Sequence, residues 1–389
     1  MKVVIEKEEL LKGIQAVFDI VPSKTALPVL SNILFDANRE DGRVCLSATD
    51  LDISITCSLS AQVEEPGWTT VPARKFLEII RELPEEPISL HAEDGRVALQ
   101  CQGVVEGFYS LMSVPAEDFP ELPREINGPE MDFSAGEEDA DSDVLRQMIS
   151  KTAFAVSKDE TRPVLNGVLW QVGDGKTTMV ATDGHRLVKY TRAVDTSGAE
   201  TEAIVPPRAL NHLVKLMSGG SRLEKVCFGQ NHLKFELSLE EDTGGTIQLF
   251  SRQIEGPFVD YEQVIPQSNG KKLRVSNNTL SPAVRRVSVL ASAQTHQLRL
   301  KIGGNQIELS ASSQEIGGEA REILDAEYDD EEMTIGYNSA YLQDVLRRID
   351  SEDVMFELDS AVAAGIIRPA DQPEGEDYLC LLMPLRLND

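Results

Sequence analysis

The sequence lacks the features that mark secreted, metal-binding and membrane proteins. Its five cysteines have no CxxC spacing and are odd in number, so neither a zinc site nor a disulfide framework is indicated. No run of about 18 apolar residues occurs, which argues against a membrane-spanning helix. The charged start, Met1–Glu9, does not have the apolar stretch of a signal peptide. We therefore expect a cytoplasmic protein that does not associate with a membrane and binds no metal or cofactor.

Positive charge is also scarce. The 37 Lys and Arg residues against 65 Asp and Glu residues give a net charge of −28, which opposes non-specific binding to nucleic acid. The distribution is uneven, however, because the stretch between Glu262 and Glu308 has no acidic residue and seven basic ones. Either these bases cluster by chance on a solvated face, or one surface is basic while the rest is acidic. The seven are Lys271, Lys272, Arg274, Arg285, Arg286, Arg299 and Lys301.

Catalytic motifs are few. Asp183–Arg186 is the one local cluster that could hold an acid/base pair. The same triplet, Ala-Thr-Asp, occurs earlier in the chain and ends at Asp50, but no histidine follows there. A structural role for both aspartates, such as capping a turn between strands, explains both copies. Gly173–Thr178 resembles part of a phosphate-binding loop but lacks the first glycine and a following helix, so we predict a hairpin turn there. We expect no catalytic residues.

Segments near the start of the chain recur near its middle. Pro28–Leu30 returns as Pro163–Leu165 at an offset of 135 residues, and Ala48–Asp50 returns as Ala181–Asp183 at an offset of 133. Repetition over this length indicates duplicated domains and not a solenoid of short units. The offset predicts a third copy that begins near residue 270.

Each copy predicts the same order of elements, a β-α-βββ half that occurs twice. In the first copy these are a strand over 2–5, a helix with Leu10, Leu11, Ile14, Val17 and Phe18 on one face, strands over 29–35, 44–48 and 52–59, a second helix closed by Pro84, and a hairpin turning at 93–95. The second copy has a helix from about Ser142, after an acidic stretch, 136–143, that we expect to be a solvated loop. The third has a strand over 273–275, a helix entered at Ser281–Pro282, a hairpin turning at 303–305 and a helix over 339–349. We predict an α+β fold of three similar domains, residues 1–126, 127–267 and 268–389.

The chain ends in an apolar run from Tyr378 to Leu387. Tyr378–Leu382 is predicted to be a buried strand. Pro384 cannot donate to a sheet ladder, so the residues after the strand should run along the surface and offer an adaptable apolar binding groove.

These motifs together resemble the bacterial sliding clamp family, the beta subunit of DNA polymerase III. The resemblance covers essentially the whole chain and rests on the order of several motifs: Met1–Val3, Leu27–Leu30, Ala181–Leu187, Gly336–Asn338 and Met383–Leu387. It implies a head-to-tail homodimeric ring with helices lining the hole and sheets outside. Such a ring encloses double-stranded DNA without sequence preference and is not an enzyme. Its expected partners are the replicative DNA polymerase, the clamp loader, repair polymerases and other proteins that carry a short clamp-binding peptide.

The resemblance also implies three sets of residues. The partner peptide would bind between the second and third domains, at Leu165, Thr182, Gly184, His185, Arg186, Leu187, Val264, Asn338, Tyr341, Leu381, Leu382, Met383, Pro384, Leu385 and Arg386. The DNA-facing candidates are Lys24, Arg74, Arg208, Arg285 and Arg286, and the dimer seam would place Phe108 and Tyr109 against Val289 and Leu290 of a second chain. Singly, each apolar member could belong to a domain core and each base could be an ordinary exposed one.

Two hypotheses from other functional classes, an enzyme and a scaffold protein, stay open at this point. A hydrolase using Asp183 and His185 would lose its activity on replacement of His185. A scaffold of repeated β-rich units would show no preference for circular over linear DNA.

Overall fold

The computed structural model describes residues 1–38, 41–101, 107–133, 140–194, 196, 198–239, 244–315 and 317–387, without the side chains of 140–142. The chain divides into two compact units. Unit 1 comprises residues 1–146, 195–201 and 208–253, and unit 2 comprises residues 147–194, 202–207 and 254–389. Each unit is described by itself below.

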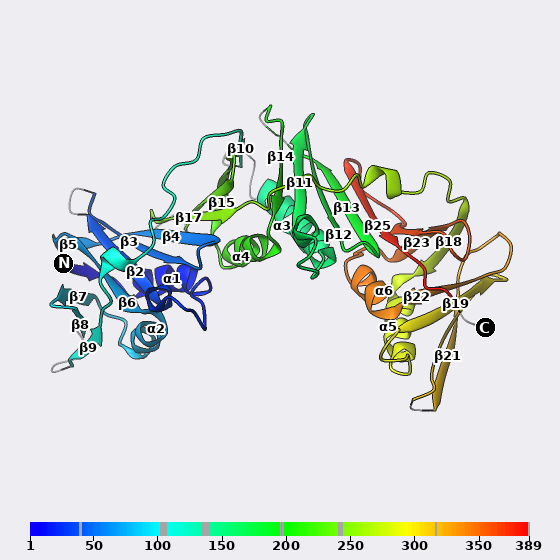
Figure 1. Ribbon diagram of the computed structural model, residues 1–389, viewed down its shortest axis with the longest axis horizontal. Coiled ribbons are helices and arrows are strands. Elements are labelled where there is room, and N and C mark those ends of the chain that lie inside the picture. The colour runs from blue at the N-terminus through cyan, green and yellow to red at the C-terminus, as the bar shows by residue number, and fades with distance from the viewer. Residues whose placement is uncertain are drawn as a thin grey trace. The chain divides into compact units, whose positions relative to one another are not determined.

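Unit 1 contains the N-terminal elements and the later strands of the middle of the chain (Figure 1). Its elements are β1 (Lys2–Ile5), α1 (Lys7–Phe18), η1 (Pro28–Ser31), β2 (Asn32–Asn38), β3 (Arg43–Thr49), β4 (Ile53–Ser60), β5 (Gln62–Glu65), β6 (Gly67–Pro72), α2 (Ala73–Glu82), β7 (Ile88–Glu93), β8 (Arg96–Cys101), β9 (Tyr109–Met112), η2 (Ala116–Asp118), β10 (Glu130–Asp132), most of α4 (Pro207–Ser218), β15 (Arg222–Phe228), β16 (His232–Ser238) and β17 (Thr246–Arg252).

Unit 2 contains the remaining elements. They are the second part of α3 (Ala140–Thr152), η3 (Ala153–Ala155), η4 (Pro163–Asn166), β11 (Val168–Gly173), β12 (Lys176–Thr182), β13 (Arg186–Ala193), β14 (Thr201–Val205), η5 (Glu262–Val264), β18 (Lys271–Ser276), α5 (Asn277–Ser288), β19 (Gln297–Gly303), β20 (Gln306–Ser313), β21 (Gly318–Asp325), β22 (Met333–Asn338), α6 (Ser339–Leu346), β23 (Asp353–Leu358), β24 (Gly365–Pro369) and β25 (Glu376–Leu382).

The element order confirms the predicted α+β fold of repeated β-α-βββ halves. Six such halves follow one another, and β5 is one strand more than predicted. In every half the third of the consecutive strands lies at one end of a four-stranded set, as β4 does in the order β6-β2-β3-β4. The other five end strands are β9, β13, β17, β21 and β25. These strands decide how the halves join.

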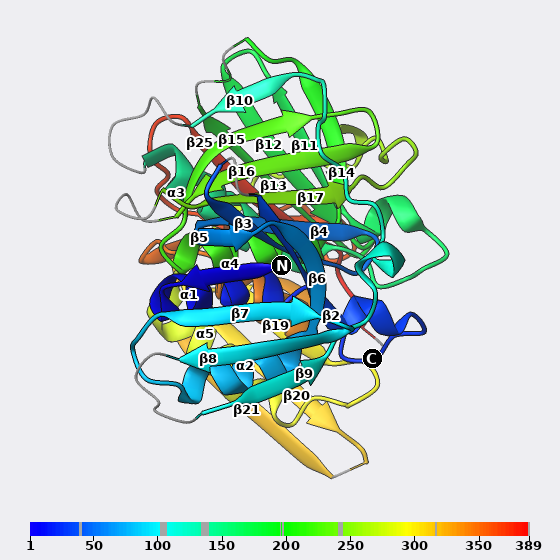
Figure 2. The same cartoon turned by 90° about the vertical axis from the view of Figure 1, so that its left-hand side faces the viewer.

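Two pairs of end strands join halves into larger sheets. In unit 1, β4 pairs antiparallel with β17 to give an eight-stranded sheet, and Figure 2 shows the two strands running side by side. In unit 2, β13 pairs in the same way with β25 and gives a second eight-stranded sheet. The remaining end strands, β9 in unit 1 and β21 in unit 2, each pair on one side only within the described part of the chain. Both are therefore open sheet edges.

Helix α1 illustrates how the sequence specifies these units. Leu10, Ile14 and Val17 recur at helical spacing and are buried against the sheet. A Cβ atom on Gly13 would lie 2.5 Å from the Leu59 side chain, so the helix approaches β4 closely at a residue without a side chain. The predicted stripe is thus confirmed for its central residues, whereas Leu11 and Phe18 are only partly buried.

Three predicted hairpin turns are confirmed. The turns after β7, β11 and β19 each place two residues at positive φ, as with Asp94 at 52° and Gly95 at 72°. Glycine, asparagine and aspartate tolerate this left-handed backbone, which a two-residue hairpin needs. The same geometry at Asp174 and Gly175 makes Gly173–Thr178 a hairpin and not a phosphate-binding loop.

Three local predictions were wrong in part. Val29–Phe35 is not strand throughout, because Pro28–Ser31 forms a 3-10 turn before β2. Helix α5 begins at Asn277, directly after β18, and not at Ser281–Pro282. Pro282 is the sixth residue of α5 and lies inside the helix, so it does not mark the helix start. Residues 140–143 are helical, and the rest of the expected acidic loop, 136–139, lies outside the described residues.

No helix in the described part of the chain is long and apolar enough to cross a membrane. The same residues contain no group of three or more His, Cys, Asp or Glu side chains placed to hold a metal ion. The thiols of Cys57 and Cys380 are buried, and burial raises the pKa of each to about 12.

Candidate functional site

The loop between β12 and β13 is fixed by two side chains of its own. The Asp183 carboxylate accepts from the backbone N–H groups of His185 (2.9 Å) and Arg186 (3.0 Å). The Thr182 hydroxyl donates to the Arg186 carbonyl oxygen (2.6 Å) and accepts from the N–H of Gly184 (3.1 Å). Gly184 has φ 89°, a value that suits glycine. Polar side chains that bond to nearby backbone groups in this way stabilise tight turns.

The equivalent loop between β3 and β4 has the same bonds. The Asp50 carboxylate accepts from the N–H groups of Asp52 (3.1 Å) and Ile53 (2.8 Å). The Thr49 hydroxyl donates to the Ile53 carbonyl oxygen and accepts from the N–H of Leu51. The structural role predicted for both aspartates is therefore confirmed. Catalysis by Asp183 loses its basis, because its other carboxylate oxygen accepts from Arg186 Nε at 3.1 Å.

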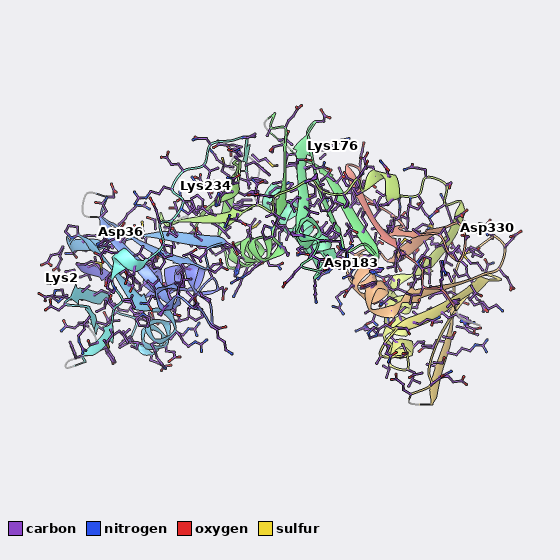
Figure 3. All side chains as sticks on the ribbon, in the orientation of Figure 1. Lys2, Asp36, Lys176, Asp183, Lys234 and Asp330 are labelled. Carbon is purple, nitrogen blue, oxygen red and sulfur yellow. The ribbon has the colours of Figure 1, made fainter. Side chains whose placement is uncertain are left out.

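Arg186 joins this loop to two other elements. Its side chain is 7% exposed, and it donates from Nη1 to Asp344 of α6 (2.8 Å) and from Nη2 to the Phe154 carbonyl oxygen in η3 (3.0 Å). The guanidinium also lies over the Tyr341 ring, 4.4 Å from its centre. Two carboxylates offset the cost of burying this charge. Figure 3 shows Asp183 beside α6, the helix that carries the Asp344 partner of Arg186.

Asn338 and Tyr341 occupy the start of α6. The Asn338 side-chain oxygen accepts from the N–H groups of Ala340 (2.9 Å) and Tyr341 (3.3 Å), which caps the helix. The Tyr341 ring stacks against His185, with 6.5 Å between ring centres. Partial burial raises the pKa of the Tyr341 hydroxyl. The cap and the ring contact fix this end of α6 against the loop after β12.

The apolar candidates divide into a buried group, which we call the floor (Leu165, Leu187, Leu381 and Leu382), and an exposed pair, which we call the rim (Val264 and Met383). Leu187 lies opposite Leu381 in the β13–β25 ladder, and both belong to a buried cluster with Ile366 and Tyr261. Leu165 and Leu382 are also buried. In contrast, Val264 is 55% and Met383 43% exposed. Gly184, His185 and Arg386 are exposed as well, while Pro384 and Leu385 are partly exposed.

The C-terminal tail leaves the sheet after β25, as predicted. The Met383 N–H donates to the His185 carbonyl oxygen (2.9 Å), and the Leu385 N–H donates to the Gly336 carbonyl oxygen (2.7 Å). A Cβ atom on Gly336 would lie 2.6 Å from the Leu387 side chain, so the tail fits against β22 only because this residue is glycine. The tail is thus held along unit 2 between the loop and β22.

All fifteen peptide-site candidates lie in unit 2. Leu165 is in η4 and Val264 in η5, and the other thirteen lie in or next to the β12–β13 loop, the tail with the end of β25, or the start of α6. Sequence reasoning missed Phe154 and Asp344, which fix Arg186 in place. Asp344 is 158 residues from Arg186 in the chain, and no local pattern signals the contact. It also missed Phe258 and Ile265, which pack against the buried floor.

The five basic candidates differ in whether they are already paired. Lys24, Arg74 and Arg285 are exposed and have no ion pair to any residue that the structure describes. Arg208 pairs with Asp50, and Arg286 makes two hydrogen bonds, of 2.9 and 2.7 Å, to Glu322 of β21. The hydrogen bond from Arg286 lowers the pKa of Glu322. Arg74 and Arg208 occupy the first turns of α2 and α4, where the helix dipole disfavours a cation. Helix stability therefore does not account for their placement.

The seam candidates lie at the two open sheet edges. Phe108, next to β9, is 69% exposed, and Tyr109 is the first residue of that strand. In unit 2, Val289 is 75% exposed, and Leu290 contacts Gly318 at the start of β21. Met112 and Ile323 add further exposed apolar surface to β9 and β21, at 71% and 51%. Open edges with apolar side chains favour pairing with another chain.

Comparison with known proteins identifies the family. Models of the DNA polymerase III beta subunit match the chain over residues 1–123 (N-terminal domain), 139–260 (central domain) and 262–386 (C-terminal domain). The beta sliding clamp of Escherichia coli strain K12 is 31% identical over 389 residues, which is all of both chains. The chain belongs to the DNA polymerase III beta subunit family.

Solved structures of this family agree along the whole chain. The DNA polymerase III beta subunit of Pseudomonas aeruginosa superimposes with a TM-score of 0.89 at 29% identity and full coverage of both chains. A second structure of the Pseudomonas aeruginosa sliding clamp, bound to griselimycin, gives a TM-score of 0.88. The beta sliding clamp of Caulobacter vibrioides is 33% identical over 396 residues, with all of both chains covered. The function is accordingly that of a DNA sliding clamp in replication, and the protein is not an enzyme.

Proposed function

We propose that two copies of this chain close head to tail into a ring around double-stranded DNA. The ring tethers the replicative polymerase and other proteins through peptides that bind in unit 2. In this proposal the chain comprises the three domains 1–126, 127–267 and 268–389. Helices face the DNA and sheets face outward, so DNA is retained by enclosure and not by a strong contact.

The open edges β9 and β21 are the observation that carries the proposal. Of the six end strands, four pair within a chain, as β4 with β17 and β13 with β25. Because all six halves have the same strand order, β9 and β21 are the equivalent edges left without a partner in the described residues. If β9 of one copy pairs with β21 of another, this contact repeats the β4–β17 and β13–β25 pairings within a chain. A ring of two copies then closes.

The charge distribution supports a loose hold on DNA. A net charge of −28 opposes tight phosphate binding, whereas Lys24, Arg74 and Arg285 are exposed cations without an ion pair in the described residues. A few such contacts give weak, sequence-independent attraction that does not prevent sliding. Arg208 and Arg286 would first have to exchange a carboxylate for a phosphate.

The peptide function is supported by the rim of exposed residues over the buried floor in unit 2. Val264 and Met383 offer apolar surface, and the exposed backbone at Gly184 allows a close approach. An extended peptide with a glutamine and two or three apolar side chains suits such a surface. Arg186 and Asn338 hold the surface in shape, since the Arg186 guanidinium and the Asn338 side-chain oxygen already have hydrogen-bond partners.

Retention on circular DNA tests the enclosure directly. The protein would be loaded with a clamp loader onto nicked circular DNA and onto the same DNA linearised, and the bound fraction followed by gel filtration. We expect retention on the circle, and loss from the linear form as the ring slides off its ends. Equal retention on both forms would contradict a ring, as would loss from the circle as fast as from the linear form.

A further inference from the structure

Unit 1 contains a cavity beside the β3–β4 loop, which is the counterpart of the loop where we propose that a peptide binds in unit 2. It has a volume of about 620 Å³ and is lined by three segments. These are the β3–β4 loop and the start of β4 (Thr49 and 51–54), the stretch 120–124, and residues of β16 and β17 with Asn231. All of these residues belong to unit 1.

The Thr and Asp side chains of the β3–β4 loop make the same hydrogen bonds to the backbone as those of the β12–β13 loop, at an offset of 133 residues. The bonds of Thr49 and Asp50 match those of Thr182 and Asp183, as described above. Leu51, at φ 83°, stands where Gly184 stands at φ 89°. The other equivalent pairs are Asp52 with His185, Ile53 with Arg186 and Ser54 with Leu187.

The strand beside the loop also corresponds. The Arg252 N–H donates to the Asp52 carbonyl oxygen at 2.9 Å, as the Met383 N–H donates to the His185 carbonyl oxygen at 2.9 Å. This register places Phe250 opposite Ser54, where unit 2 has Leu381 opposite Leu187.

The stretch that follows η2 supplies the third wall. Leu122 comes three residues after the buried Phe119, as Val264 comes three residues after the buried Tyr261. Leu122 lines the cavity, and it also packs against the small buried cluster around Phe119. Loop, strand and linker thus reproduce, in one cavity, the surroundings proposed for a peptide in unit 2.

Leu51 distinguishes this cavity from an ordinary surface hollow. Leucine is strained at φ 83°, and its side chain is 52% exposed. Glycine would occupy the same turn without strain, as Gly184 does. An apolar side chain that is held in a strained backbone and directed to solvent at a cavity indicates a contact with a ligand.

The charges around the cavity differ from those in unit 2. Arg252 replaces Met383, and Arg124 lines the cavity without an ion pair to any described residue. The nearest carboxylate to Arg252 is that of Asp52, at 4.0 Å, and Glu121 is the other acid in the lining. Burial, with Arg252 nearby, lowers the pKa of His232 and so keeps that side chain neutral at neutral pH. The arginine without a partner suits a carboxylate on the ligand.

We propose that this cavity is a second peptide-docking site, which takes an extended segment of a partner protein carrying apolar side chains and a flanking carboxylate. The apolar side chains contact Leu51 and Leu122 above the buried Phe250, and the carboxylate pairs with Arg124. The class of ligand rests on the proposed peptide function of unit 2, whereas the cavity and its residues belong to unit 1 alone. One chain would then hold two peptides of different charge.

Two labelled peptides and three variants of the full chain test the proposal. The probes are fluorescein-labelled Glu-Leu-Phe-Gly-Asp and its amide counterpart Gln-Leu-Phe-Gly-Asn, titrated by fluorescence anisotropy. The variants are Leu51→Gly, which relieves strain and so preserves folding, Arg124→Glu, and a deletion of residues 383–389. Arg96→Glu, at an exposed hairpin turn, is the matched charge control.

We expect Leu51→Gly and Arg124→Glu each to raise the Kd of the acidic peptide about tenfold, with no change from Arg96→Glu or the deletion. Unchanged affinity in both cavity variants overturns the proposal, and so does a Kd above about 1 mM for the intact chain. The amide peptide reports on unit 2 separately. If it still binds the deletion variant while the acidic peptide responds to Leu51→Gly, the proposed peptide function of the tail fails and the unit 1 site stands.

Discussion

Units 1 and 2 contain the same antiparallel pairing of two end strands, but the side chains beside that pairing differ. Each has an eight-stranded sheet formed where two end strands meet, and each has a loop fixed by one threonine and one aspartate beside that joint. In unit 2 the loop carries Arg186, a buried cation that reaches α6 and η3. In unit 1 the same position is Ile53, which is 2% exposed, and the strained Leu51 faces solvent. A conserved backbone arrangement within one chain therefore supports two surfaces of different chemistry.

The open edges give the largest expected effect. Tyr109→Glu together with Leu290→Glu should convert the dimer to monomers, because each edge would then carry charge where apolar surface must be buried. Light scattering would report the mass. The matched control places Glu at Val362, which is exposed in unit 2 but lies outside β21 and its neighbours. A dimer that persists in the double variant would mean that β9 and β21 do not form the seam.

Removing the tail should affect unit 2 alone. Deletion of Met383–Asp389 removes the bond to His185 and the exposed Met383, so binding of a glutamine-containing apolar peptide should be lost. Gly336→Ala is a milder test, since its Cβ would displace Leu387 while leaving the sequence of the tail intact. Isothermal titration would measure the affinity, and light scattering should show an unchanged dimer. Full affinity in the deletion variant would exclude the tail from the site.

The two loop aspartates should differ in their contribution to stability. Asp183→Ala leaves the buried Arg186 with one carboxylate in place of two, which we expect to cost about 3–5 kcal/mol. Asp50→Ala removes two backbone hydrogen bonds and a pair with the half-exposed Arg208, and should cost about 1–2 kcal/mol. Urea unfolding of both variants measures the difference. Equal losses would show that Arg186 does not depend on Asp183.

The basic residues of α5 give the smallest effect. Reversing Arg285 and Arg286 to Glu should shorten retention on circular DNA at moderate salt and leave the dimer intact. Each phosphate contact that is lost should reduce the salt dependence of binding by about 0.9 in log–log slope. Because Arg286 is held by Glu322, Arg285→Glu alone should account for most of the change. Retention that does not respond to either variant would remove this helix from the DNA-facing surface.

Local patterns were sufficient for much of the fold. The stripe of Leu10, Ile14 and Val17 predicted α1, and Asp94–Gly95 predicted a hairpin, because each depends on neighbours within a few residues. The helix start at Asn277 could not be predicted in this way. It depends on where β18 ends and on the bond from the Asn277 N–H to the carbonyl oxygen of the distant Glu352.

The candidate site shows the same division. Its loop and tail could be found from the sequence, because the Ala-Thr-Asp repeat and the proline after the last strand are local signals. The burial of Arg186 could not, because Phe154 and Asp344 reach it only in the folded chain. The cavity of unit 1 likewise joins three segments that are far apart in the sequence.

Periodicity and short-range hydrogen bonds set the repeated β-α-βββ halves, their turns and the role of the loop aspartates, so these features could be predicted from the residues alone. Three features became visible only in the folded chain. These are which end strands pair and which stay open, which candidates are buried and which exposed, and the position of Leu51 at a cavity. Those outcomes depend on contacts between residues more than a hundred positions apart, and no local pattern encodes such contacts.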